Sequence, residues 1–345
     1  MIETQPDISL AQFAGKIRNG EVVAFPTETV YGLGADVWNA DAVARIFELK
    51  GRPPDNPLIV HVSSIEMVET VVSDISDDAR RLMERFWPGP LAIIFPKRPE
   101  VLDIVTAGLP TVAVRMPDHP IPLRLISEAG PIAAPSANTS GRPSPTRAEH
   151  VRQDFGDDVP VIDGGSCQYG LESTVLDLSI MPYTILRPGR ITQSELEQVL
   201  ERPVRLAVLD PAGLAQLKNA PRSPGMKYTH YAPNARVRWM VEEECCPPGP
   251  PHRDKPANHT LYLLHRGQNS GDSPVHPHNA GDLGPGDQVI DYKGDYTEMA
   301  RDLYDRFRMA DLKGFREIAI EPFSGHDDGT TALLNRIEKA IGQGG

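Results

Sequence analysis

The sequence predicts an α/β protein of two units, and three observations indicate this class. Short apolar runs alternate with helix-like segments along residues 1 to about 200. A stretch rich in proline, glycine and aromatic residues follows, and a second, shorter alternation fills the remainder. A chain of 345 residues also favours two domains of roughly 150 residues each. We therefore expect a larger domain over 1–204, a linker over 205–235 and a smaller α/β domain over 236–345.

The strands expected in the first domain are short apolar runs bounded by turn residues. They are VVAF (22–25), PLIVHV (57–62), LAIIF (91–95), TVAVRM (111–116), GPIAAP (130–135), PVID (160–163) and STVLDL (173–178). Residues 40–50 and 77–86 have helical spacing instead. Asn39 or Asp41 can cap the first helix and Gly51 can end it. Lys50 and Arg52 then lie at its C-terminal end, and one interpretation gives these cations a surface role, in which they offset the helix dipole.

The second domain shows the same pattern with fewer elements. Its expected strands are VRWMV (237–241), TLYLLH (260–265), QVIDY (288–292) and EIAIEP (317–322), and residues 299–312 have the spacing of an amphipathic helix. Residues 245–259 and 267–287 are too rich in proline, glycine and asparagine to pack, so we expect exposed loops there. Their histidines are irregularly spaced, which favours solvated side chains over a metal site.

Composition excludes several classes of protein. The chain is 40% hydrophobic and 24% charged, as soluble proteins are. Its start has no basic stretch leading into an apolar core, and no run reaches the roughly 18 apolar residues of a membrane span, so we expect a cytoplasmic protein without membrane contact. The net charge of −12 argues against binding nucleic acid by bulk electrostatics. Cys167, Cys245 and Cys246 have the spacing of neither a disulfide framework nor a zinc site.

Polar residues gather where the first domain's strands begin and end, although no P-loop, Rossmann, nucleophile-elbow or zincin motif is present. Residues 50–61, KGRPPDNPLIVH, supply donors suited to phosphate or carboxylate. Alternation in TVAVRM places Thr111, Ala113 and Arg115 on one face of a strand, which indicates a polar cavity there.

Three further segments have the same character. The loop PSANTSGRPSPT (135–146) offers hydroxyls and backbone amides that could hold a phosphate chain. STVLDL presents Ser173 and Asp177 on one face of a strand, and LRPGRIT is expected to place Arg187 in a tight turn. Each cluster alone is ordinary loop chemistry, but together on one domain they indicate a binding site.

The order of these motifs resembles a known family. PTETVYGLGA, KGRPPDNPLIVHV, TVAVRMP, PSANTSGRPSPT, GLESTVLDL, LRPGRIT and PGMKYTHYAP are similar to the YrdC-like family, in the long two-domain form of threonylcarbamoyl-AMP synthase. The resemblance to the YrdC-like domain covers about residues 8–200, and the remainder resembles the extra C-terminal domain. It implies a twisted mixed sheet flanked by helices, with a concave polar cavity, followed by a smaller Rossmann-like α/β domain.

The resemblance also implies an activity. The enzyme would join L-threonine, bicarbonate and ATP into threonylcarbamoyl-adenylate and release pyrophosphate, with Mg²⁺ accompanying the triphosphate. A partner transferase would pass the threonylcarbamoyl group to the adenosine beside the anticodon of certain tRNAs, so no stable tRNA binding is expected of this chain.

Site residues follow from the resemblance, motif by motif. Threonine would be bound by Thr29, His61, Arg115, Ser173 and backbone near Ala134. ATP would be bound by Arg52, Asn56, Thr111, Ser136, Ser144, Arg187 and Tyr231. Lys50 and Arg52 would act on the phosphates as catalytic cations, and no metal ligand among the protein side chains is assigned. The linker around Tyr231 is expected to fold over the cavity as a lid.

Substrate chemistry accounts for the hydroxyls of PTETVYGLGA. Threonine presents a hydroxyl, an amine and a carboxylate, so its pocket needs short hydroxyl partners such as Thr29 and Ser173 and a fixed cation such as Arg115. Gly32 and Gly34 are expected to let the backbone approach the substrates. No serine or cysteine has an evident base, so we expect catalysis by placement and charge stabilisation.

Two other functions remain open from the sequence. The first is a carbamoyltransferase that handles carbamoyl-adenylate on the same fold, against which the long form with its tyrosine-bearing linker argues. The second is a non-catalytic RNA-binding module, against which the acidic charge and the lack of a basic, aromatic-interleaved tract argue.

Overall fold

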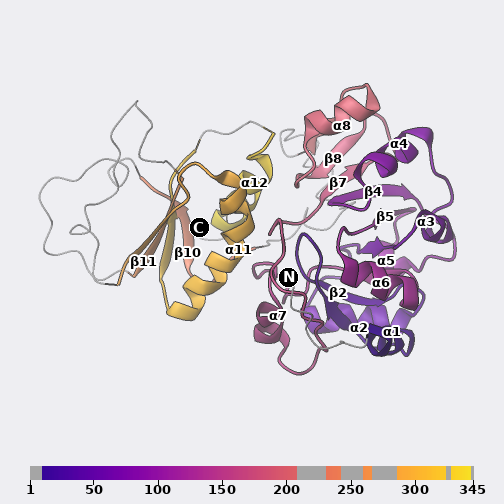
Figure 1. The fold of residues 1–345 in the computed structure, drawn as a ribbon, viewed down its shortest axis with the longest axis horizontal. Helices are drawn as coiled ribbons and strands as arrows, with labels where there is room; N and C mark the ends of the chain where they lie inside the picture. The colour runs from indigo at the N-terminus through magenta and orange to yellow at the C-terminus, as the bar shows by residue number, and fades with distance from the viewer. Residues whose placement is uncertain (1–9, 208–230, 242–258, 266–285, 324–327, 343–345) are drawn as a thin grey trace, which may run out of the picture. The chain divides into compact units, whose positions relative to one another are not determined.

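The computed structural model describes residues 10–207, 231–241, 259–265, 286–323 and 328–342. The chain divides into two compact units (Figure 1). The first contains residues 1–140 and 144–228, and the second contains 141–143 and 229–345. Most of the expected linker, including Tyr228 and His230, lies outside the described residues, as do most of the two expected loops.

A mixed sheet forms the centre of the first unit. Within the described residues its nine strands have the order β1-β2-β6-β3-β5-β4-β7-β8-β9, with parallel and antiparallel pairs. The strands are β1 Val23–Phe25, β2 Gly32–Asp36, β3 Ile59–His61, β4 Leu91–Pro96, β5 Thr111–Arg115, β6 Ile132–Ala134, β7 Thr174–Asp177, β8 Thr184–Arg187 and β9 Arg205–Leu206. The sequence had predicted a further strand at 160–163, and this is wrong: Val161 makes only an isolated bridge to Ala24.

Eight helices of the first unit lie within the described residues. They are α1 Leu10–Arg18, α2 Ala40–Lys50, α3 Ile65–Val71, α4 Asp77–Phe86, α5 Asp103–Thr106, α6 Pro120–Ala129, α7 Ala148–Phe155 and α8 Gln193–Leu200. The Asn39 side chain caps α2 by accepting a hydrogen bond from the Ala42 N–H at 3.1 Å. Gly51 ends this helix in the left-handed conformation at φ 59°, which costs glycine little.

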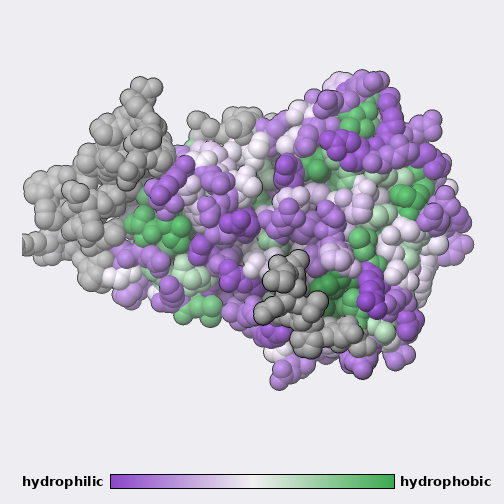
Figure 2. Space-filling model, viewed as in Figure 1, coloured by the Kyte–Doolittle hydropathy of each residue, from purple (hydrophilic) through white to green (hydrophobic). Residues whose placement is uncertain are grey.

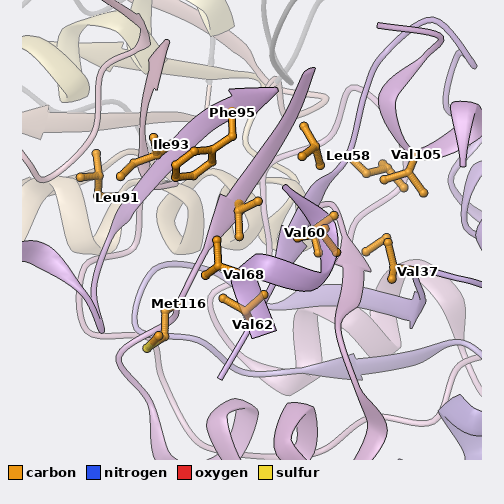
Figure 3. Packing of buried hydrophobic residues seen from close by; sticks show 14 of the residues in the cluster. Val37, Leu58, Val60, Val62, Val68, Leu91, Ile93, Phe95, Val105 and Met116 are labelled. Carbon is orange, nitrogen blue, oxygen red and sulfur yellow. The ribbon is translucent and has the colours of Figure 1, made fainter. Parts of the chain in front are cut away.

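The two faces of this sheet differ in what they carry. On one face Val112 and Val114 join the large apolar core with residues of helices such as Val68. Figure 3 shows how side chains such as Val60 and Phe95 meet in that core. A smaller cluster of strand residues and Ala207 lies on the opposite face, namely Ile59, Ala92, Ile94, Ala113, Val175, Leu186 and Ala207. Alternation along β5 places Arg115 on this second face.

The second unit is a parallel α/β layer. Its strands β10 Arg236–Trp239, β11 Thr260–Leu264, β12 Gln288–Asp291 and β13 Glu317–Ile320 have the order β10-β13-β11-β12, and each pair is parallel. Helices α11 Tyr296–Lys313 and α12 Thr331–Ile341 pack beside it (Figure 1). The Asp295 carboxylate caps α11 by accepting from the Glu298 N–H at 2.8 Å.

Polar side chains cover most of the face seen in Figure 2, with small separate apolar patches on the described surface. Among the described residues, no helix combines the length and the apolar character that crossing a membrane requires.

Candidate active site

A buried threonine organises the turn after β1. The Thr27 hydroxyl lies 2.6 Å from the Val30 carbonyl oxygen, which can only accept, so Thr27 donates there. Thr27 Oγ1 also lies 2.9 Å from Thr29 Oγ1. The backbone N–H groups of Thr29 and Val30 also point at Thr27 Oγ1, at 3.1 and 3.2 Å. These two N–H groups use both lone pairs of the Thr27 oxygen, so the Thr29 hydroxyl has its hydrogen as well as its lone pairs to offer a ligand.

Gly32 and Gly34 make room for an aromatic ring rather than for a substrate. A Cβ atom at Gly34 would lie 2.6 Å from both Phe25 and Ile132, and one at Gly32 would lie 3.0 Å from the Phe25 ring. The expectation that these glycines let the backbone approach a substrate is therefore wrong, because the Phe25 side chain fills that space. The ring meets His61 edge-on, with centroids 6.0 Å apart and planes at 82°.

His61 and Arg115 lie side by side on the sheet. They are register partners in the parallel pair β3·β5, and His61 also faces Ile132 of β6. Burial and the nearby charge of Arg115 lower the pKa of His61 from 6.5 to about 3, and Arg187 adds to this effect. The imidazole is therefore neutral at physiological pH. Its Nδ1 is buried and makes no hydrogen bond to any described residue.

Arg115 is buried and already has a carboxylate beside it. Its Nη2 lies 2.6 Å from Oε1 of Glu28, and its Nε donates to the Gly89 carbonyl at 3.3 Å. Both side chains of the ion pair are at most 4% exposed. Arg115 was predicted from the sequence to lie in the site, whereas Glu28 was not. The sequence does show a carboxylate between two threonines at the end of a buried strand. Its partner Arg115 is distant in the sequence, so the ion pair could not be predicted.

Lys50 and Arg52 are buried, so the surface interpretation of these cations is wrong. Lys50 Nζ donates to the Ser136 carbonyl at 2.6 Å and to the Asn138 carbonyl, which ties the loop after β6 to the end of α2. Arg52 Nε donates to the Asn56 carbonyl at 3.1 Å and its Nη2 to that of Pro57 at 2.9 Å. Through these hydrogen bonds to backbone carbonyls, Lys50 and Arg52 fix the conformation of the segments that carry the predicted ATP-binding residues.

Asn56 and Ser136 are polar residues whose backbone carbonyls accept from Arg52 and Lys50, respectively. The Asn56 side chain is 2% exposed, and neither its oxygen nor its nitrogen bonds to a described residue. Buried amides are rarely left in this state, and a bound ligand would satisfy it. Ser136 Oγ donates to Oδ1 of Asn138 at 2.5 Å.

Ser173 and Arg187 form a second buried pair. Arg187 donates through Nε to the Ser173 carbonyl at 3.0 Å and through Nη2 to the Ser173 hydroxyl oxygen at 3.1 Å. Ser173 therefore accepts from Arg187 and keeps its hydroxyl hydrogen to donate elsewhere. Arg187 is the last residue of β8, paired with Val175, so the expectation of a tight turn is wrong.

The remaining predicted residues of the first unit lie on the same sheet or its loops. Ser144 donates to Oε1 of the buried Glu172 at 2.6 Å. Thr111 begins β5 opposite Pro96, and Ala134 ends β6 opposite Ile59. Burial raises the pKa of the Cys167 thiol to about 12, so this cysteine is not a thiolate nucleophile.

Tyr231 belongs to the second unit. Its ring stacks on Tyr304 of α11 with centroids 5.4 Å apart, and the Arg336 guanidinium lies 5.2 Å from its centre. The residue is 5% exposed and adopts φ 77°, a conformation that few residues other than glycine take. Its predicted contact with the nucleotide stays a prediction.

Within the described residues, no group of three or more histidine, cysteine, aspartate or glutamate side chains could hold a metal ion. Lys50, Arg52, Arg115 and Arg187 are buried cations of the first unit, and buried cations suit anionic ligands.

A nine-stranded mixed sheet followed by a parallel α/β unit is the architecture of the two-domain YrdC-like class. Residues 15–189 match the Sua5/YciO/YrdC family model, described as "Telomere recombination", and residues 191–342 match "Threonylcarbamoyl-AMP synthase, C-terminal domain". The chain belongs to the threonylcarbamoyl-AMP synthase family, in its two-domain form.

Similar proteins cover nearly the whole chain. The threonylcarbamoyl-AMP synthase of Pyrococcus abyssi is 44% identical over 335 residues, 95% of this chain and 93% of that protein. The Bacillus subtilis protein of the same name is 44% identical over 349 residues, 97% and 94% of the two chains. The crystal structure of P. abyssi Sua5 complexed with L-threonine superposes with a TM-score of 0.80 at 38% identity and covers 99% of this chain and 96% of that one. The expected α/β fold is thereby confirmed.

Proposed function

We propose that this protein is an L-threonylcarbamoyladenylate synthase. It forms threonylcarbamoyl-AMP and pyrophosphate from L-threonine, bicarbonate and ATP, for the modification of tRNA adenosine next to the anticodon. The observation that carries the proposal is the full-length similarity to relatives named for this activity. The chemistry of the buried side chains on the sheet supports it.

Threonine recognition follows from the polarity of two hydroxyls. Thr29 can donate or accept, because backbone N–H groups use the lone pairs of the neighbouring Thr27 oxygen. Ser173 can donate, because Arg187 occupies a lone pair of its oxygen. An amino acid with a side-chain hydroxyl has both donors and acceptors to match this pair, and Arg115 supplies the cation for its carboxylate. His61 then offers its free Nδ1 as a neutral group, with backbone near Ala134 completing the site.

ATP would lie along the segments that Lys50 and Arg52 hold in place. The proposed contacts are Arg52, Asn56, Thr111, Ser136, Ser144, Arg187 and Tyr231. The unpartnered amide of Asn56 supports a ligand at this position. Mg²⁺ accompanying the triphosphate would supply charge neutralisation, because hard cations prefer phosphate oxygens.

The reaction needs positioning more than an activated side chain. Bicarbonate loses hydroxide to give CO₂, the threonine amine adds to the carbon of CO₂ to give a carbamate, and the proton that the amine loses leaves with the hydroxide as water. A carbamate oxygen then attacks the α-phosphorus of ATP. The bond between the α-phosphorus and the α,β-bridging oxygen breaks, and pyrophosphate leaves. Lys50, Arg52 and Arg187 would stabilise the negative charge that develops on the phosphates. A cytoplasmic transferase would then consume the adenylate.

Pyrophosphate release by the full chain tests the proposal. With Mg²⁺ and ATP, release should require both L-threonine and bicarbonate, and mass spectrometry should detect threonylcarbamoyl-AMP. Omitting each substrate in turn gives the control. Equal pyrophosphate release without threonine would refute the proposal. If carbamoyl phosphate supports pyrophosphate release in the absence of bicarbonate and threonine, the protein is a carbamoyltransferase instead.

A further inference from the structure

Glu28 is a buried carboxylate to which the reaction as described gives no role. The residue is 2% exposed and lies between Thr27 and Thr29 in the turn after β1. Neither of its carboxylate oxygens makes a well-aligned hydrogen bond to a described residue. Its one close ionic contact among those residues is the Arg115 guanidinium, 2.6 Å from Oε1. A carboxylate is buried in this way only with a charge to balance.

The surroundings of Arg115 suggest what Glu28 does. A guanidinium is planar and has three nitrogens that can donate. Nε donates to Gly89 O and Nη2 lies beside Glu28, so two of the three nitrogens are engaged, while Nη1 has no polar contact with another residue in the described part of the chain. A planar group held at two of its nitrogens has a restricted orientation, and binding a carboxylate to its third nitrogen then costs little further ordering.

We propose that Glu28 is a positioning residue for threonine, acting by holding the Arg115 guanidinium so that Nη1 meets the substrate carboxylate. This inference rests on the proposed function, in which Arg115 receives that carboxylate. A competing role has the opposite sign: if the substrate carboxylate had to displace Glu28 from Arg115, removing the Glu28 charge would strengthen threonine binding.

Threonine titrations of the full chain separate these roles. Glu28→Gln keeps the shape of the side chain and removes its charge, and we expect threonine affinity and kcat/KM for threonine to fall at least tenfold. KM for ATP should stay within twofold of wild type. Glu28→Asp keeps the charge and should recover part of the loss. Glu21→Gln serves as the matched control, because Glu21 is exposed and paired only with exposed Lys16 among the described residues.

A double-mutant cycle shows whether Glu28 acts through Arg115. In an Arg115→Met background, adding Glu28→Gln should change threonine affinity less than twofold, because the group it positions is gone. This double variant also removes both buried charges together, which a fold tolerates better than one unpaired charge. If Glu28→Gln alone does not fold, Glu28→Asp measured with and without Arg115→Met carries the test.

Three results would overturn the positioning role: tighter threonine binding by Glu28→Gln, equal losses for threonine and ATP, or additive effects in the cycle. The wild-type titration tests the proposed function separately, since variants are compared with it as ratios. A wild-type chain that bound no threonine would overturn both inferences.

Discussion

Replacing Gly34 by alanine tests the packing of Phe25 over β2. The new Cβ would lie 2.6 Å from Cε1 of Phe25 and 2.6 Å from Cγ2 of Ile132. Carbon atoms in van der Waals contact are about 3.5–4.0 Å apart, so each neighbour must move by about 1 Å. Phe25 and Ile132 are both fully buried, with no exposed surface into which they can shift.

The expected loss of stability follows from two opposing terms. Overpacking of a closed core costs about 1–3 kcal/mol, whereas replacing glycine by alanine recovers about 0.4–1 kcal/mol from the unfolded chain. Gly34 does not have a positive φ, so no backbone strain is added. We expect Gly34→Ala to destabilise the first unit by about 1–2 kcal/mol. Threonine affinity should also fall severalfold, because Phe25 contacts His61.

Hydrogen exchange measured against urea, in peptides covering β1, β2 and β6, reports the stability of the first unit alone. Gly15→Ala is the matched control, since a Cβ at this helical position meets nothing within 4 Å and should stabilise the unit by about 0.5–1 kcal/mol. Phe25→Leu should partly rescue Gly34→Ala by vacating the space that the methyl group needs. If Gly34→Ala is as stable as wild type, the ring does not fill the space above the glycine, and the reasoning fails.

Two further predictions concern the same site. His61 has a pKa lowered from 6.5 to about 3, so the unfolded chain takes up a proton below pH 6.5 that the folded chain refuses, and folding stability falls with acidification at about 1.4 kcal/mol per pH unit. Relative to His61→Gln, the wild type should therefore lose about 3 kcal/mol between pH 6.5 and pH 4 in urea unfolding, and parallel pH profiles would contradict the assigned neutrality. Thr27→Val removes the hydroxyl that fixes Thr29, and it should weaken threonine binding and cost about 1–3 kcal/mol of stability. Thr27→Ser should restore most of both, and equal threonine binding by the valine variant in a calorimetric titration would show that Thr27 does not position Thr29.

Local patterns predicted the helices and strands that have one clear period. Alternation in TVAVRM correctly separated Val112 and Val114 from Arg115, because one face of β5 joins the apolar core. Strand β2 was missed, since GLGAD contains the residues that strands avoid. Its glycines are explained only by Phe25, which a preceding strand places over them.

Partners distant in the sequence explain what could not be predicted about the site. Residue type and motif order indicated Lys50 and Arg115, but the carbonyls of Ser136 and Asn138 and the carboxylate of Glu28 are set by the folded chain. Arg187 was expected in a turn because proline and glycine follow it, yet pairing with β7 extends β8 to include it. The direction in which each hydroxyl donates also depends on such neighbours.

The second unit is discontinuous, since it includes residues 141–143 from within the predicted phosphate-binding loop. Arg308 of α11 donates to the Pro143 carbonyl through Nε at 3.1 Å and Nη2 at 2.6 Å, and the Gly141 carbonyl accepts from the Ala232 N–H at 3.0 Å. The chain therefore passes between the units at three places in the sequence. Dividing the gene at a single point between the two units would place residues 141–143 on a different polypeptide from Arg308 and Ala232, to which they are hydrogen-bonded. Exchanging the second unit between two proteins of this family therefore means replacing residues 141–143 of the loop as well as the C-terminal part of the chain. A chimaera that takes α11 from another protein must take residues 141–143 from the same protein.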